Sequence, residues 1–227
     1  MRGREPAVSE QRNGRKRSLL AQERSRDTRE AIIRAALELW RERGYAAGTD
    51  DPTAEEIAER AGISKATFYL HFARKDDILL APAWVTTKVF HEDALQALLV
   101  GGPVEDILDD VTVRLSRRIQ NVPRLLLQRM LHAQAPVREP EPRRDDAEHF
   151  GFDRGFALIF LQAQQSGDLP QTLSAAALGS MFEAMAYQSM REWAYQADAD
   201  LLATLRTRFA VLLAGARAVT PEALSRR

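Results

Sequence analysis

The feature that most constrains this chain lies in residues 53–72, where two short helical patterns follow one another across a tight turn. In the first pattern Thr53 is placed to cap a helix, and Glu56, three residues later, completes a capping box. Gly62 ends the pattern because glycine readily adopts the left-handed conformation that follows many helices. Ser64 then begins the second pattern. Two short helices joined by a turn containing glycine have the proportions of a helix-turn-helix unit.

A longer helical pattern precedes this motif. Asp27 stands at its expected N-cap with Glu30 at the capping-box spacing, and Gly44 supplies the C-terminal stop. Its apolar residues recur at helical spacing. We therefore expect it to form a small core with the motif, made of Ile33, Leu37, Trp40, Ile57, Ala61, Ile63, Phe68 and Phe72.

If the two phenylalanines of the second short helix face that core, small and polar side chains are left on its outer surface. Hydroxyl and imidazole groups donate hydrogen bonds to phosphate oxygens, and the first turn of a helix in the major groove reaches base edges. A helix N-terminus also favours an anion. The predicted DNA-binding surface comprises Lys65, Ala66, Thr67, Tyr69, His71 and Lys75. The same spacing also fits an ordinary helical hairpin with a polar face.

The rest of the chain is predicted to be helical, because no alternating β pattern of any length occurs and apolar residues recur at helical spacing. A proline-rich, charged stretch near residues 136–149 is expected to be a loop, and two long helices are expected over residues 172–195 and 198–218. The class is therefore all-α. We expect a three-helix DNA-binding domain over residues 27–80, followed by a helical domain over residues 81–227.

The N-terminal arm, residues 1–26, lacks hydrophobic periodicity and is predicted to be disordered. Residues 1–27 hold eight Arg or Lys against four acidic residues, although the whole chain has a formal net charge of zero. Such a basic arm suits phosphate binding, and it equally suits a solvated tail.

Composition argues against several other classes of protein. The chain has no cysteine, and no apolar run approaches the roughly 20 residues that span a bilayer. The basic N-terminus lacks the apolar stretch of an export signal, so we expect a cytoplasmic protein. Its balanced charge also argues against a protein that coats DNA without sequence preference.

No enzymatic site, metal site or cofactor is predicted. The acids of residues 105–110, "EDILDD", resemble one half of a magnesium-diphosphate site, but no second acidic motif faces them, and a solvated helix face explains them better. His91, His132 and His149 have no partner at a ligand spacing.

Residues 53–79, "TAEEIAERAGISKATFYLHFARKDDIL", closely resemble the DNA-binding signature of the tetracycline-repressor-like (TetR) family of transcriptional regulators. The preceding "AIIRAALELWRERGY" resembles the first helix of that family, so that the likeness extends over residues 26–80. One departure is the extra segment "AAGTDDP" before Thr53, which we interpret as a loop that leaves the motif intact.

The resemblance implies a role for each residue of the motif. Thr53 and Lys75 would hold phosphates at helix N-termini. Lys65, Ala66 and Thr67 would face the bases, and Tyr69 and His71 would contact the DNA backbone. The implied DNA-binding set is Thr53, Ser64, Lys65, Ala66, Thr67, Tyr69, His71 and Lys75.

The resemblance further implies a homodimer that pairs through the last two helices, binds a palindromic operator and releases it when a small-molecule effector binds. The sign of regulation expected is repression. The effector and its binding residues are not specified by the sequence. Six residues fit either an effector pocket or ordinary core: Met130, Phe152, Phe156, Met181, Phe182 and Tyr187.

Overall fold

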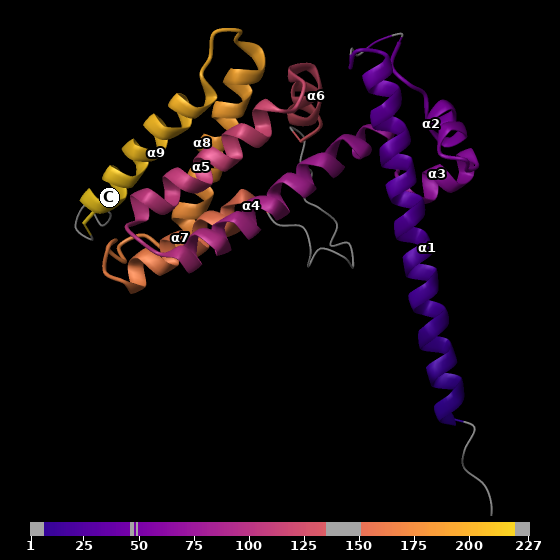
Figure 1. Cartoon of the computed structure of the whole chain (residues 1–227), viewed down its shortest axis with the longest axis horizontal. Helices are drawn as coiled ribbons and strands as arrows, with labels where there is room; N and C mark the ends of the chain where they lie inside the picture. Colours follow the sequence, from indigo (N-terminus) through magenta and orange to yellow (C-terminus); the bar gives the residue numbers. More distant parts are fainter. Residues whose placement is uncertain (1–6, 46–47, 49, 135–150, 221–227) are drawn as a thin grey trace, which may run out of the picture. The chain divides into compact units, whose positions relative to one another are not determined.

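The computed structural model describes residues 7–45, 48, 50–134 and 151–220. Its regular structure in this described part is entirely helical (Figure 1), which confirms the all-α prediction. The chain divides into two compact units, Met1–Ile78 and Leu79–Arg227. This division falls close to the boundary expected after residue 80.

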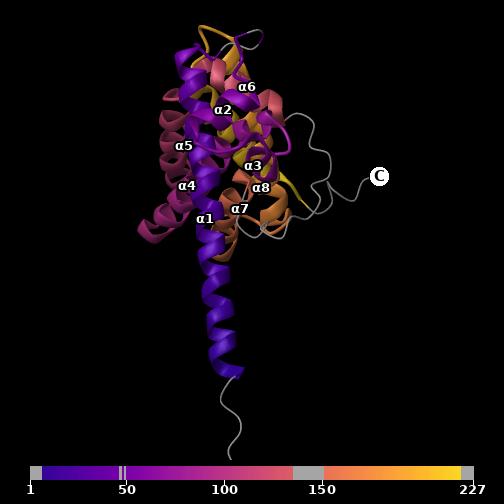
Figure 2. The ribbon, with the colours of Figure 1, turned by 90° about the vertical axis from the view of Figure 1, so that its right-hand side faces the viewer.

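The first unit contains a long helix and a short helical hairpin. Its elements are α1 (Ala7–Glu42), α2 (Ala54–Arg60), α3 (Lys65–His71) and the beginning of the 3-10 helix η1 (Lys75–Leu79). Figures 1 and 2 show α2 and α3 beside the C-terminal half of α1, while the N-terminal half of α1 continues beyond them.

The start of α1 corrects the prediction of a disordered arm. The helix begins at Ala7, so Asp27 lies inside it and is not its N-cap. The Thr28 hydroxyl instead donates to the Arg24 carbonyl, 2.8 Å away and one turn back in the same helix. Residues with fair helix propensity connect this stretch to the amphipathic part of the helix, so the helix propagates through a region without apolar periodicity. Residues 1–6 lie outside the described part.

The core of the first unit is close to the predicted one. Trp40, Ile57, Phe68 and Phe72 are buried as expected. Along α1, however, the buried positions are Ile32, Ala35, Ala36 and Leu39. The predicted Ile33 and Leu37 are only partly buried, as are Ala61 and Ile63. The buried stripe of α1 is thus rotated by about one residue from the prediction.

In its described residues, the second unit is a bundle of six helices. Their bounds are α4 (Leu80–Val100), α5 (Val104–Gln120), α6 (Arg124–Gln134), α7 (Phe152–Gln165), α8 (Ala175–Tyr195) and α9 (Leu201–Ala218). Side-chain caps define the starts of the last two helices. Ser174 accepts from the Ala177 amide and Asp200 from the Ala203 amide, within a few residues of the predicted starts. The predicted loop near residues 136–149 lies outside the described part.

Phenylalanines form the centre of this bundle. Phe182 of α8 contacts rings of α7 and α9, with its centroid 4.6 Å from that of Phe160 and 4.9 Å from that of Phe209. One face of α5 is apolar and packs into the bundle, since Val104, Ile107, Leu108, Val111 and Leu115 are all buried. Within the described residues, no helix is long and apolar enough to cross a membrane.

Candidate nucleic-acid interface

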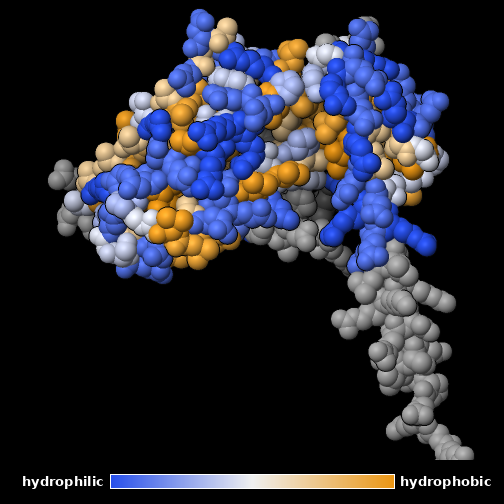
Figure 3. All heavy atoms as spheres, in the orientation of Figure 1, coloured by the Kyte–Doolittle hydropathy of each residue, from blue (hydrophilic) through white to orange (hydrophobic). Residues whose placement is uncertain are grey.

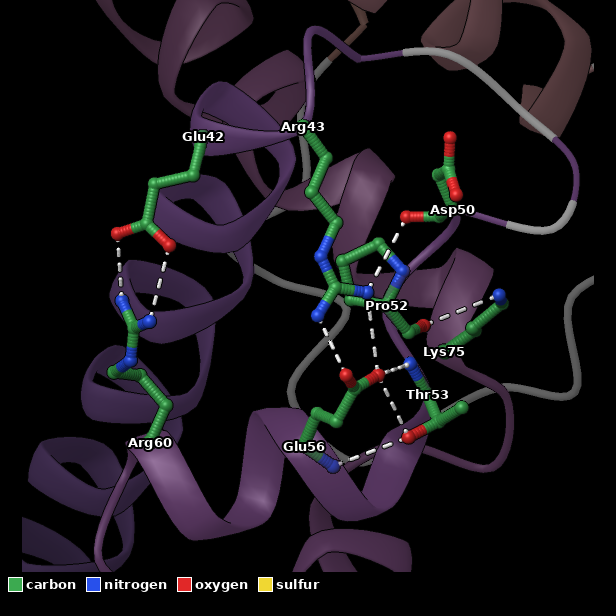
Figure 4. A network of polar contacts seen from close by, with 8 residues as sticks. All are labelled: Glu42, Arg43, Asp50, Pro52, Thr53, Glu56, Arg60 and Lys75. Atoms are coloured by element: carbon green, nitrogen blue, oxygen red, sulfur yellow. Dashed lines mark hydrogen bonds and ion pairs between the residues drawn. The ribbon is translucent and has the colours of Figure 1, made fainter.

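The first short helix of the motif, α2, is fixed at its N-terminus by a complete capping box. The Thr53 hydroxyl accepts a hydrogen bond from the Glu56 amide at 3.2 Å, and the Glu56 carboxylate accepts from the Thr53 amide at 2.7 Å (Figure 4). Arg43, the residue after the end of α1, also binds this carboxylate, at 2.5 Å. Together, the Arg43 guanidinium and the Thr53 donors lower the pKa of Glu56 to about 2. Both donors of Thr53 are engaged by Glu56, so a phosphate would have to share or replace these bonds.

The loop before the motif is anchored by Asp51, which the sequence reasoning passed over. One carboxylate oxygen accepts from the Trp40 indole N–H at 2.7 Å, and the other accepts from the Lys75 ammonium at 2.5 Å. Lys75 also donates to the Pro52 carbonyl at 3.2 Å (Figure 4). Asp51 therefore joins α1 to η1, and Lys75 is held against the end of the inserted loop.

The second short helix, α3, begins at its predicted cap. The Ser64 hydroxyl accepts from the Thr67 amide at 3.0 Å, and the two hydroxyls lie 2.8 Å apart. Ala66 is exposed beside them. Because α3 is short, this cap fixes half of the helix, including the first turn expected to reach base edges.

Lys65, in the same first turn, forms an ion pair with Glu55 of α2. Both side chains are more than half exposed, so the pair lies on the surface and contributes little to stability. The bond from Lys65 lowers the pKa of Glu55, and the carboxylate raises the pKa of Lys65. Both groups are therefore charged at neutral pH. Lys65, which is predicted to face the bases, is thus paired with a carboxylate.

Tyr69 and His71 lie further along α3. Tyr69 is exposed, and its ring packs edge-on against Phe68 with centroids 5.3 Å apart. His71 is partly buried, and this burial, followed by the nearby Arg29 guanidinium, lowers the pKa of His71. The imidazole is therefore neutral at pH 7 and offers one N–H donor.

Arg29 of α1 closes the other end of α3. Its guanidinium donates to the His71 carbonyl at 3.0 Å and lies over the Phe72 ring, 4.3 Å from the centroid. The first contact satisfies a carbonyl of the last helical turn, which has no partner within the helix. The second is a cation–π contact. Both ends of α3 are thus tied down.

Leu70 is the residue of α3 that the sequence reasoning missed. It is 84% exposed, the most exposed large apolar side chain of the described DNA-binding motif. In the space-filling view, less hydrophilic residues interrupt the hydrophilic surface at α3 (Figure 3). The available signal was helical spacing, since Leu70 lies two residues from each of the buried Phe68 and Phe72 and so opposite the core.

In the second unit, a cavity of about 20 Å³ lies among α4, α5, α6, α7 and α8. Three of the six residues that fitted either a pocket or core line it, namely Met130, Phe152 and Tyr187. Thr86 and Thr87 of α4 also line it, and their hydroxyls donate to the Pro82 and Trp84 carbonyls of the same helix. The cavity wall is therefore mostly apolar.

A second hollow, of about 210 Å³, opens between α8 and α9. Met181, Phe182 and Val211 line it, and Val211 is 68% exposed. Phe156 lies away from both cavities, fully buried among aromatic rings. The α8–α9 face thus presents apolar side chains to the outside.

Three of the four acids that suggested half of a magnesium-diphosphate site are engaged in ion pairs. Glu105 pairs with Arg217, Asp109 with Arg206 at 2.6 Å, and Asp110 with Arg114 at 2.8 Å. Within the described residues, no group of three or more acidic or histidine side chains could hold a metal ion. Two of these ion pairs join α5 to α9, and the third lies within α5.

Comparisons with known proteins agree with this geometry. The family model for bacterial regulatory proteins of the tetR family matches residues 32–81. The HTH-type transcriptional regulator TcmR of Streptomyces glaucescens is 26% identical over 201 residues, 80% of each chain.

Solved structures extend the likeness to both units. Thermus thermophilus FadR, described as a TetR-family transcriptional repressor in complex with lauroyl-CoA, is 26% identical. The match covers 85% of this chain and 95% of that chain, with a TM-score of 0.69. A putative TetR-family regulator from Mesorhizobium loti, at 24% identity, covers 85% of this chain and 98% of its own with a TM-score of 0.58, and shows the same fold. The helix-turn-helix, the bundle that follows it and these relatives lead to one conclusion: residues 32–81 match the tetR family model, and the chain as a whole is similar to TetR-family transcriptional regulators.

Proposed function

We propose that this regulator is a ligand-responsive repressor that binds a palindromic operator as a homodimer and releases it when a small apolar effector binds. The observation that carries the proposal is α3, a short helix capped at both ends whose outward side chains are polar, small or exposed. A braced helix of this kind presents its N-terminal residues to the major groove. Such a protein acts where chromosomal DNA lies, in the cytoplasm.

One group of residues contacts the bases of the DNA, and a second group contacts its phosphate backbone. Lys65, Ala66 and Thr67 face base edges from the first turn of α3, and exposed Leu70 adds an apolar contact suited to a thymine methyl. Contacts with the phosphate backbone come from Thr53, Ser64, Tyr69, His71 and Lys75. Thr53 and Lys75 exchange or share their present partners when they do so.

The homodimer forms through α8 and α9. The apolar hollow between these helices and the exposed Met181 and Val211 suit a second copy of the same face. A two-fold axis then relates two copies of α3, and the operator repeats with the same symmetry. Introduction of negative charge by Val211→Glu together with Met181→Glu should yield monomers in sedimentation velocity, without loss of helix content.

The effector enters the cavity among α4–α8. The cavity is too small for a drug-sized ligand as it stands, so binding requires side chains such as Met130 and Met190 to move aside. The apolar wall favours an apolar ligand, and the relative from T. thermophilus was solved with lauroyl-CoA. Lauroyl-CoA is therefore the first probe for release of DNA.

Selection of bound DNA from a random pool tests the function directly. We expect an inverted repeat to be enriched, and the selected DNA to be bound far more tightly than random DNA of equal length. If no inverted repeat is enriched, the specific-regulator proposal is wrong. Equal affinity for selected and random DNA would instead indicate a coating protein.

Two substitutions separate the proposed roles. Tyr69→Phe removes one hydroxyl from an exposed ring and should weaken binding to all sequences alike, because a backbone contact carries no sequence information. Lys65→Ala should weaken binding and also change the selected base at one position of each half-site. Arg154→Ala, on α7 of the second unit, is the control that should change neither.

A further inference from the structure

Glu55 is an acidic residue in direct contact with the proposed DNA-binding surface. It lies in the first turn of α2, and its carboxylate binds the ammonium group of Lys65 in the first turn of α3. Lys65 is a proposed base-facing residue, so the carboxylate lies within hydrogen-bond contact of a group that enters the groove. A negative charge at this position opposes binding to the phosphate backbone, which attracts cations whatever the sequence.

The ion pair limits what Lys65 can do on DNA of arbitrary sequence. To bind a phosphate, the ammonium group must share or leave the carboxylate, which stays charged at neutral pH. The pair as a unit has no net charge, so it adds little to sequence-independent affinity. At a suitable base pair, however, the lysine can bind guanine O6 or N7 while the carboxylate accepts from a cytosine amino group.

From this juxtaposition we infer that Glu55 is a specificity-determining residue of DNA binding: it suppresses backbone binding by Lys65 and selects cytosine at one position of each half-site. The inference rests on the proposed function. It adds a repulsive element to recognition, which raises discrimination by weakening the complexes with wrong sequences.

The same helix supplies a matched control. Glu59 lies four residues after Glu55, on the same exposed face of α2 and one turn further along. Its carboxylate makes no ion pair with any other residue of the described chain. Glu55→Gln and Glu59→Gln therefore remove the same charge from the same face, and only the first disrupts the ion pair with Lys65.

The test measures affinity for the selected operator and for random DNA, over a range of salt concentrations, with the wild-type chain and both variants. For Glu55→Gln we expect tighter binding to random DNA and a salt slope steeper by about 0.9, the value for one additional phosphate contact. The ratio of specific to random affinity should fall about tenfold, in the range of one base-reading side chain. Renewed selection should replace cytosine by adenine at one position, because glutamine pairs with adenine.

Three other outcomes would overturn the inference. Equal changes in both variants would assign the effect to net charge alone, and an unchanged ratio with Glu55→Gln would remove Glu55 from recognition. Circular dichroism of both variants identifies a folding defect. In that case Glu55→Asp, which keeps the carboxylate, replaces Glu55→Gln and should keep the cytosine preference. Loss of the cytosine preference in Glu55→Asp counts against the inference. If the wild-type chain enriches no operator, the proposed function itself fails, which is distinct from these three results.

Discussion

Asp51 offers the sharpest test of how the DNA-binding unit is held together. Its carboxylate, 11% exposed, accepts from the fully buried Trp40 and from Lys75, whose side chain is 32% exposed. Asp51→Ala deprives the buried indole N–H of this acceptor, which costs about 1–3 kcal/mol. Loss of the partly exposed ion pair with Lys75 adds about 0–1 kcal/mol. We expect the free energy of unfolding of this unit to fall by about 1–4 kcal/mol.

Asp51→Asn separates the contribution of the indole hydrogen bond from that of the ion pair with Lys75. The amide oxygen can still accept from Trp40, while the charge that attracts Lys75 is gone, so the expected loss is about 1 kcal/mol or less. The assay is urea denaturation of the full chain, followed by Trp40 fluorescence in a reference background that carries Phe at Trp84 and Trp193. These are the other two tryptophans of the chain. If Asp51→Ala and Asp51→Asn lose equal stability, the indole hydrogen bond contributes nothing and the reasoning is refuted.

Three further predictions concern pH, the bundle core and the missed residue of α3. The pKa of Glu56 is about 2 in the folded chain against an ordinary 4.5, so its contribution to stability is complete above pH 4.5 and is lost as pH falls towards 2. The urea midpoint reported by Trp40 should fall over that range, and the fall should be smaller in Glu56→Gln. Phe182→Ala should destabilise the second unit by about 3–5 kcal/mol in calorimetry, because the ring is fully buried among other rings; a loss below about 1 kcal/mol would contradict that packing. Leu70→Ala should leave thermal stability unchanged and weaken operator binding about fivefold, close to 1 kcal/mol for the apolar contact removed, whereas unaltered affinity in a gel-shift titration would exclude Leu70 from the interface.

Local signals sufficed for the helix-turn-helix. A capping residue, an acid three positions later and a glycine after the helix act within a few residues of one another. Thr53, Glu56 and Gly62 accordingly have the predicted conformations, with the glycine at φ 70°. The face of α5 was equally readable, because its apolar residues recur on one side of the helix.

Features that depend on distant partners could not be predicted. Asp51 joins residues far from it in sequence, Trp40 and Lys75, and composition alone placed it in a loop. The ion pair between Glu55 and Lys65 depends on how α2 packs against α3. The first half of α1 was missed for a different reason: a helix without an apolar face has no periodic signal, although its residues permit helix formation. No local sequence pattern indicates the contacts of Asp51 or the ion pair between Glu55 and Lys65.

The two contacts of Arg29 have a mechanical consequence. A pivot of α3 against α1 would have to break the hydrogen bond to the His71 carbonyl and the contact with the Phe72 ring at once. The bridge through Asp51 adds a second connection, between α1 and η1, in the same unit. In the proposed function, an effector would therefore displace the DNA-binding unit as a whole, and the spacing between the two units of the proposed dimer, rather than the shape of either one, would change.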